Sequence, residues 1–122
     1  MNQIRSAAFP HQRLEAYRLA LELAAEARQL CATIPRGYRH IADHLQRPAD
    51  DAVLLLAEGA NRWGNGEKRQ RFIESRGECG EAAAAADLVG VHGFAPQAMV
   101  AGFQQRENRL AAMITGLVHR CS

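Results

Sequence analysis

The segment His40-Ile41-Ala42-Asp43-His44 has residue types and a spacing that resemble a metal site. On a helix, residues three and four positions apart share one face, so His40, Asp43 and His44 would point the same way. Zinc binds imidazole and carboxylate groups, but a catalytic zinc also needs a third ligand and an open coordination position. Two histidines at this spacing are common by chance at the solvated start of a helix. We therefore predict no metal, no cofactor and no catalytic residue here.

Glu58 and Glu81 form a second candidate pair, because adjacent antiparallel helices could bring the two carboxylates face to face. Di-iron bundles use carboxylates from several helices, but they also contain Glu-x-x-His pairs. No such pair occurs in this chain. We expect Glu58 to be a structural carboxylate that pairs with Arg62, Arg76 or a neighbouring subunit.

Basic residues cluster around a glycine-containing turn in the middle of the chain. They are Arg62, Lys68, Arg69, Arg71 and Arg76. Together with Glu67 and Glu74 they give this segment a net charge of +3, the difference between five basic and two acidic residues. The segment is the best candidate for phosphate contacts, although the chain's net charge of +2 does not by itself indicate a nucleic-acid-binding protein. Trp63 and Phe72 lie nearby, but we expect both rings to be buried, and base stacking requires exposure.

Nucleophilic chemistry has little support in the sequence. Cys31, Cys79 and Cys121 are odd in number and show no C-x-x-C spacing, which argues against a disulfide framework or a zinc knuckle. Cys31 and Cys79 fall on apolar or small-residue faces, where an unreactive buried thiol is expected. The segment Met1–Pro10 lacks the apolar core of a signal peptide, and no apolar run approaches 18 residues. We expect a soluble cytoplasmic protein.

The elements that position these residues are predicted to be helices. Strong helix formers dominate the 122 residues, β-branched residues are scarce, and Pro and Gly interrupt the periodic segments. The predicted helices cover about 11–33, 38–63, 67–91 and 96–119. Their similar lengths and short connections predict one all-α domain, 1–122, an antiparallel up-down-up-down four-helix bundle. Pro48 should kink the second helix or split off its first part.

Two segments are apolar on more sides than a single bundle needs. Val53–Ala57 is apolar in nearly every direction, which a subunit interface would explain. The residues predicted to face inward from the third helix are Phe72, Ile73, Gly77, Cys79, Gly80, Ala83 and Leu88. Many of these are small and would let a neighbouring helix approach closely.

Several motifs occur in the order found in a known family. They are Arg13-Leu14-x-x-Tyr17-x-x-Ala20, Ile34-Pro35-x-x-Tyr38, His44-Leu45-Gln46-Arg47, Ala57-Glu58-Gly59-Ala60-x-Arg62, Glu67-Lys68-x-x-Arg71-Phe72 and Arg76-Gly77-x-x-x-Glu81. Together they resemble the bacterial four-helix-bundle proteins encoded in intervening sequences of 23S ribosomal RNA genes. That family is related to accessory variability proteins that act beside reverse transcriptases in diversity-generating retroelements.

The resemblance spans about Phe9 to His119, and its most specific part is the Ala-Glu-Gly segment with the Lys and Arg-Phe that follow. It implies a left-handed bundle, a homopentameric barrel, no enzymatic activity and nucleic-acid binding on a basic surface. It also marks Glu58, Gly59 and Glu81 as motif residues. The chain departs from the family pattern at four positions, namely Pro48, Asp51, Leu55 and Glu78.

The sequence therefore favours a non-enzymatic homo-oligomeric bundle, expected to be pentameric, that acts as a nucleic-acid-associated or scaffolding accessory protein. RNA or DNA, a reverse transcriptase or another protein are its candidate partners, and a membrane is not. The alternative is a protein–protein interaction module with no role in nucleic-acid binding. Salt separates the two hypotheses, because phosphate contacts weaken steeply as the salt concentration rises.

Overall fold

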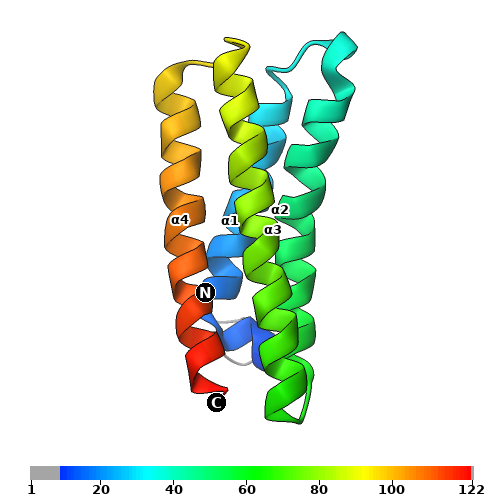
Figure 1. Cartoon of the computed structure of the whole chain (residues 1–122), viewed down its shortest axis with the longest axis vertical. Helices are drawn as coiled ribbons and strands as arrows, with labels where there is room; N and C mark the ends of the chain where they lie inside the picture. The colour runs from blue at the N-terminus through cyan, green and yellow to red at the C-terminus, as the bar shows by residue number, and fades with distance from the viewer. Residues whose placement is uncertain (1–8, 122) are drawn as a thin grey trace.

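The computed structural model describes residues 9–121, which form four α-helices and two short 3-10 helices and contain no strand. In chain order these are η1 (Pro10–Arg13), α1 (Glu15–Cys31), η2 (Arg36–Tyr38), α2 (Arg39–Asn61), α3 (Asn65–Val91) and α4 (Gln97–Arg120). The four α-helices run alternately up and down one long axis (Figure 1). Helix α1 packs against α2 and α4, and α3 packs against the same two helices, so α1 and α3 lie on a diagonal. The predicted antiparallel four-helix bundle is confirmed.

The predicted helix boundaries agree with the observed ones to within a few residues, with one difference in kind. The first predicted helix is broken at Leu14, whose backbone is extended (φ −82°, ψ 129°), so η1 is separate from α1. Helix α2 continues through Pro48, so the predicted split is absent. Pro48 is buried in the bundle, and Gln46 beside it donates hydrogen bonds to the Ala24 carbonyl at 3.1 Å and to Asp50 at 3.0 Å. Packing therefore holds the turn that proline weakens.

The core is a continuous column of aliphatic side chains with few aromatic rings. Its largest fully buried apolar residues are Leu23, Leu30, Ile41, Leu45, Leu56, Val89, Leu110 and Ile114. Every α-helix contributes to this column, which explains why the helices form together rather than singly. None of the helices within residues 9–121 has the length and apolarity needed to cross a membrane.

Helices α2 and α3 approach closely because small residues line the seam between them. Gly59 on α2 lies directly against the Phe72 ring, and a Cβ added to Gly59 would sit 2.6 Å from Phe72 Cε1. Farther along, the buried Ser75 hydroxyl donates a hydrogen bond to the Ala52 carbonyl at 2.8 Å. The seam therefore fixes the register of α3 against α2.

The outward face of α3 differs from the prediction. Phe72 and Cys79 are buried as expected, but Ile73, Gly77, Gly80 and Leu88 are exposed. The other inner positions are taken by Ser75, Ala82, Ala85, Ala86 and Val89. Small and apolar residues occur on both the buried and the exposed side of α3, so the sequence pattern alone did not fix the helix's rotation.

Candidate nucleic-acid interface

The turn between α2 and α3 is held by side chains from the motifs identified in the sequence. Lys68 Nζ donates to the Ala60 carbonyl at 2.9 Å and to the Gly59 carbonyl at 3.4 Å, and so caps the end of α2. Glu58 forms ion pairs with Arg62 at 3.5 Å, as expected, and with Arg71 at 3.8 Å. The Ala-Glu-Gly and Lys–Arg-Phe motifs are therefore brought together to stabilise this turn.

The five basic residues predicted to contact phosphate do not form one surface. Arg71 points toward α2, where it meets Glu58, and it also pairs with Glu74 at 3.3 Å. Arg76 points toward α4 and its Nε donates to Thr115 Oγ1 at 2.8 Å. Arg69 is exposed and makes no hydrogen bond or ion pair with any residue in 9–121. Arg69 is therefore the member freest to contact a ligand, and Arg62, although paired with Glu58, is half-exposed.

Trp63 is the main correction to the expected site. Its side chain is 96 % exposed, so the prediction that it is buried is wrong, whereas Phe72, 4 % exposed, is buried as expected. Trp63 follows the last turn of α2 and precedes Gly64, and no element of residues 9–121 covers this tip of the bundle (Figure 1). An exposed indole ring at this turn is available for stacking with a nucleic-acid base.

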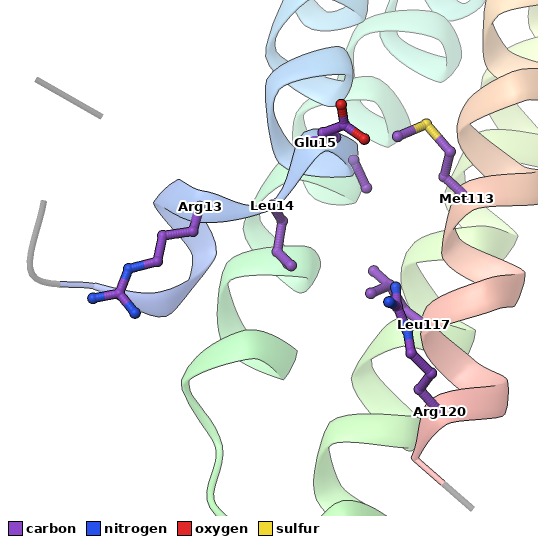
Figure 2. Close-up of a pocket in the computed structure, with 7 residues that line it drawn as sticks. Arg13, Leu14, Glu15, Met113, Leu117 and Arg120 are labelled. Atoms are coloured by element: carbon purple, nitrogen blue, oxygen red, sulfur yellow. The ribbon is translucent and has the colours of Figure 1, made fainter. Parts of the chain in front are cut away.

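Two further arginines reach the same end of the bundle from opposite termini of the described chain. Arg13 extends from η1 away from the helices, and Arg120 lies on the last turn of α4 (Figure 2). Between them is a cavity of about 360 Å³ that Leu14 and Leu117 also line. A hydrogen bond of 2.7 Å between His11 and Asn61 joins η1 to the end of α2. Sequence reasoning missed both arginines, since only the antiparallel fold brings the termini beside the central turn.

The fold separates charge along the bundle axis. We call the end that holds the α2–α3 turn the basic end; it consists of segments 9–18, 52–76 and 112–121. It contains eight Lys or Arg and four Asp or Glu, a net charge of +4. The other described segments, 19–51 and 77–111, contain six Lys or Arg and nine Asp or Glu, a net charge of −3. A polyanion would therefore approach the basic end first.

Three of the side chains considered as metal ligands, Glu58, Glu81 and His44, have other partners. Glu81 pairs with His44 at 3.2 Å, while Glu58 meets Arg71 ten positions earlier on α3, so the two carboxylates lie about 15 Å apart along the helix axis. The expectation that they could face each other is wrong. Within residues 9–121, no three His, Cys, Asp or Glu side chains are grouped closely enough to hold a metal ion.

The thiols lie in environments that disfavour the reactive thiolate form. Cys79 is buried and Cys31 is half-buried, and burial is the main cause that raises the pKa of each thiol. Nearby carboxylates, Glu107 for Cys79 and Asp43 for Cys31, raise both values further. Thiolate chemistry is therefore disfavoured at both positions.

The chain matches no protein-family model, and a search of curated proteins finds no significant match.

Proposed function

We propose that this protein is a non-enzymatic helical bundle that binds single-stranded nucleic acid at its basic end. The observation that carries the proposal is Trp63, exposed at the tip and adjacent in sequence to Arg62. Base stacking on an aromatic ring accepts any base, and nearby guanidinium groups contact the phosphates. A duplex hides the faces of its bases, so this arrangement favours an unpaired strand.

Because Trp63 is the chain's only tryptophan, its fluorescence reports on this tip alone. We expect a single-stranded oligonucleotide to quench the emission in a saturable, salt-sensitive manner, and a duplex of the same length to quench it less. Replacing Arg13 and Arg69 by glutamate should weaken binding by roughly tenfold or more and lower the slope of log K against log salt by about 1.4, since two phosphate contacts are lost.

The matched control is the pair Arg36→Glu and Arg39→Glu, which reverses two exposed charges at the opposite end of the bundle. Both double variants change net charge equally, so equal losses of affinity would mean that only overall charge matters and that the basic end is not the site. Heparin provides a second control. Quenching by heparin equal to that by the oligonucleotide would contradict base stacking on Trp63.

We further propose that the protein assembles with copies of itself, as the family resemblance implies. The support is a stripe of exposed small and apolar residues along α3, which we call the α3 stripe. It consists of Ile73, Gly77, Gly80, Ala84, Leu88 and Val91. Val91 is 80 % exposed, and monomeric proteins rarely leave such a continuous apolar face uncovered.

A second, different apolar surface lies across the bundle from the α3 stripe. Leu21 on α1 and Leu54 on α2 are both exposed, and they line a shallow cavity of about 330 Å³ with Ala24, Val53 and one charged residue, Asp50. Two unlike surfaces on one chain fit a head-to-tail contact, and such contacts generate a closed ring when the rotation closes. This pairing supports a cyclic assembly, for which the resemblance predicts five copies.

Light scattering after size exclusion tests the assembly. We expect a mass near five times that of the 13.4 kDa chain, and we expect Ala84→Glu to reduce it to that of a monomer, because a buried unpaired carboxylate in the contact is costly. Ala112→Glu places the same charge on an exposed position of α4 outside the stripe and should leave the mass unchanged. A wild-type monomer would contradict the assembly. If such a monomer captured a protein partner in a salt-insensitive way, the interaction-module alternative would replace the proposed function.

A further inference from the structure

Glu107 on α4 is a buried carboxyl group whose hydrogen-bonding capacity is not fully used. Its side chain is 2 % exposed, and Oε1 is the only buried side-chain oxygen or nitrogen among residues 9–121 without a hydrogen-bond partner. Nearly all buried polar atoms in folded proteins are hydrogen bonded, and leaving one unsatisfied is destabilising. An oxygen in this state calls for a donor that is not supplied by the described chain.

The space beside this carboxyl is a cavity of about 240 Å³ between α3 and α4. Gly80, Ala83 and Ala111 line it, and their small side chains leave the room that larger residues would fill. Nothing lies within 4 Å of where a Cβ of Gly80 would be. No residue of α1 or α2 lines this cavity, so its walls belong to one helix pair.

None of the polar side chains around the cavity donates a hydrogen bond to Glu107 Oε1. Arg76 is held at the rim by Thr115. Gln104 Nε2 donates to the Ala83 carbonyl at 3.0 Å and to Asp87 at 2.5 Å, so its amide donates outward. The Cys79 thiol is the one titratable group of α3 that hydrogen bonds to the Glu107 carboxyl. Arg76 and Asn108 also carry N–H groups at this cavity, but none of them donates to Glu107 Oε1 in this structure.

We propose that this cavity binds a small primary ammonium group, with the Glu107 carboxylate as its counter-ion. An ammonium brings three N–H donors and a charge opposite to that of Glu107. Asp87, which accepts a hydrogen bond from Gln104, adds a negative charge near the cavity, and Arg76 in the lining adds a positive one. The cavity is smaller than typical drug-sized sites, and its alanine and glycine walls fit a short alkyl chain behind the charged head.

The ammonium has two possible sources, a free alkylamine or a lysine side chain of another protein. A second copy of this chain is not a source within residues 9–121, because their only lysine, Lys68, caps α2. The inference is independent of nucleic-acid binding, although the cavity shares Gly80 with the α3 stripe. It concerns the α3–α4 seam, whereas Trp63 lies at the tip of the bundle, so either proposal can fail without the other.

Amide NMR shifts of the full chain test the proposal, with propylammonium and Nα-acetyl-lysine methylamide as the two probes. We expect saturable shifts confined to the α3–α4 seam, and the tighter probe identifies the source. Propanol lacks the charge and tetramethylammonium lacks the N–H donors, so neither should produce these shifts. Affinity should rise up to tenfold per pH unit between pH 5 and pH 7, where Glu107 loses its proton, and then level off.

Two variants separate binding from folding. Glu107→Gln keeps the shape of the side chain and should weaken propylammonium binding at least tenfold at pH 8, and Ala83→Leu should abolish it by filling the cavity. Dispersed spectra of both variants in the absence of probe would establish that they fold. Each of three results would overturn the proposal. Propanol could bind as tightly as propylammonium, the Glu107→Gln variant could bind propylammonium as tightly as the wild type, or neither probe could give a saturable shift. The last result would leave water as the only occupant.

Discussion

Between pH 4 and pH 8 we expect the titration of Glu107 to lower the unfolding free energy of the wild-type protein by roughly 3 kcal/mol. The Glu107→Gln variant should not show this decrease. Burial is the main cause that raises the pKa of Glu107 from its ordinary value of 4.5 to about 7, and the hydrogen bond from Cys79 opposes it in part. A shift of this size corresponds to roughly 3 kcal/mol, because each pKa unit is worth about 1.4 kcal/mol.

The direction follows from proton binding. Between pH 4.5 and pH 7 the folded protein holds the Glu107 proton and the unfolded chain does not, so rising pH favours unfolding. The contribution of Glu107 is therefore fully present below pH 4.5 and is lost as pH rises through about 7. Glutamine cannot ionise, so the variant should be the more stable protein at pH 8.

Urea unfolding at several pH values measures this effect as a difference between wild type and variant, which cancels the titration of other groups. Glu67→Gln is the matched control, because Glu67 is exposed in the first turn of α3. A wild-type-minus-variant difference for Glu107→Gln that stays flat from pH 4 to pH 8 would show that burial does not hold this proton.

Replacing Gly59 by alanine is the second large effect, an expected loss of about 2 kcal/mol in unfolding free energy. Alanine normally stabilises a helix relative to glycine by about 1 kcal/mol. At position 59, however, the new Cβ would lie 2.6 Å from the buried Phe72 ring and 3.2 Å from Arg71 Cβ. Neither α3 nor the ring can move aside without opening the seam, and overpacking of this kind costs about 1–3 kcal/mol.

The control for Gly59 is Gly116→Ala on α4, where nothing lies within 4 Å of the added Cβ. That variant should gain about 1 kcal/mol, so the two glycine replacements should have opposite signs. A double variant with Phe72→Leu should recover part of the loss at Gly59, because the smaller side chain vacates the space. The cycle consists of the wild type, Gly59→Ala, Phe72→Leu and the double variant, each measured by denaturant unfolding. If the changes in unfolding free energy of the two single variants add up to that of the double variant, Gly59 and Phe72 do not interact.

Local sequence signals were enough for much of the fold. Pro35 with Gly37, the Gly64-Asn65-Gly66 turn and Pro96 set the helix ends to within a few residues, because residues that stop or start a helix act on their immediate neighbours. Pro48 is the exception. The same local rule predicts a kink or a split there, but α2 is not split, and Pro48 is buried on the bundle side.

The candidate site was less accessible to such reasoning. Glu107 is charged, yet its spacing from Phe103, Leu110 and Ile114 places it on the apolar face of α4, so the sequence does carry a signal of its burial. No comparable signal exists for Trp63, since a tryptophan beside a turn is buried or exposed according to what faces it. Arg13 and Arg120 are over one hundred positions apart, and only the return of α4 brings them to the same end.

The sequence by itself determined the helices, their order and their antiparallel packing, because these depend on propensities and breakers that act over a few residues. Only the tertiary structure decided which side of α3 faces solvent, whether Trp63 is exposed, and where on the bundle positive charge is concentrated. These features depend on how each helix is rotated about its axis and on which distant segments meet. In α3, where small and apolar residues occur on both the buried and the exposed side, that rotation is fixed by the contacts of Gly59 with Phe72 and of Ser75 with Ala52.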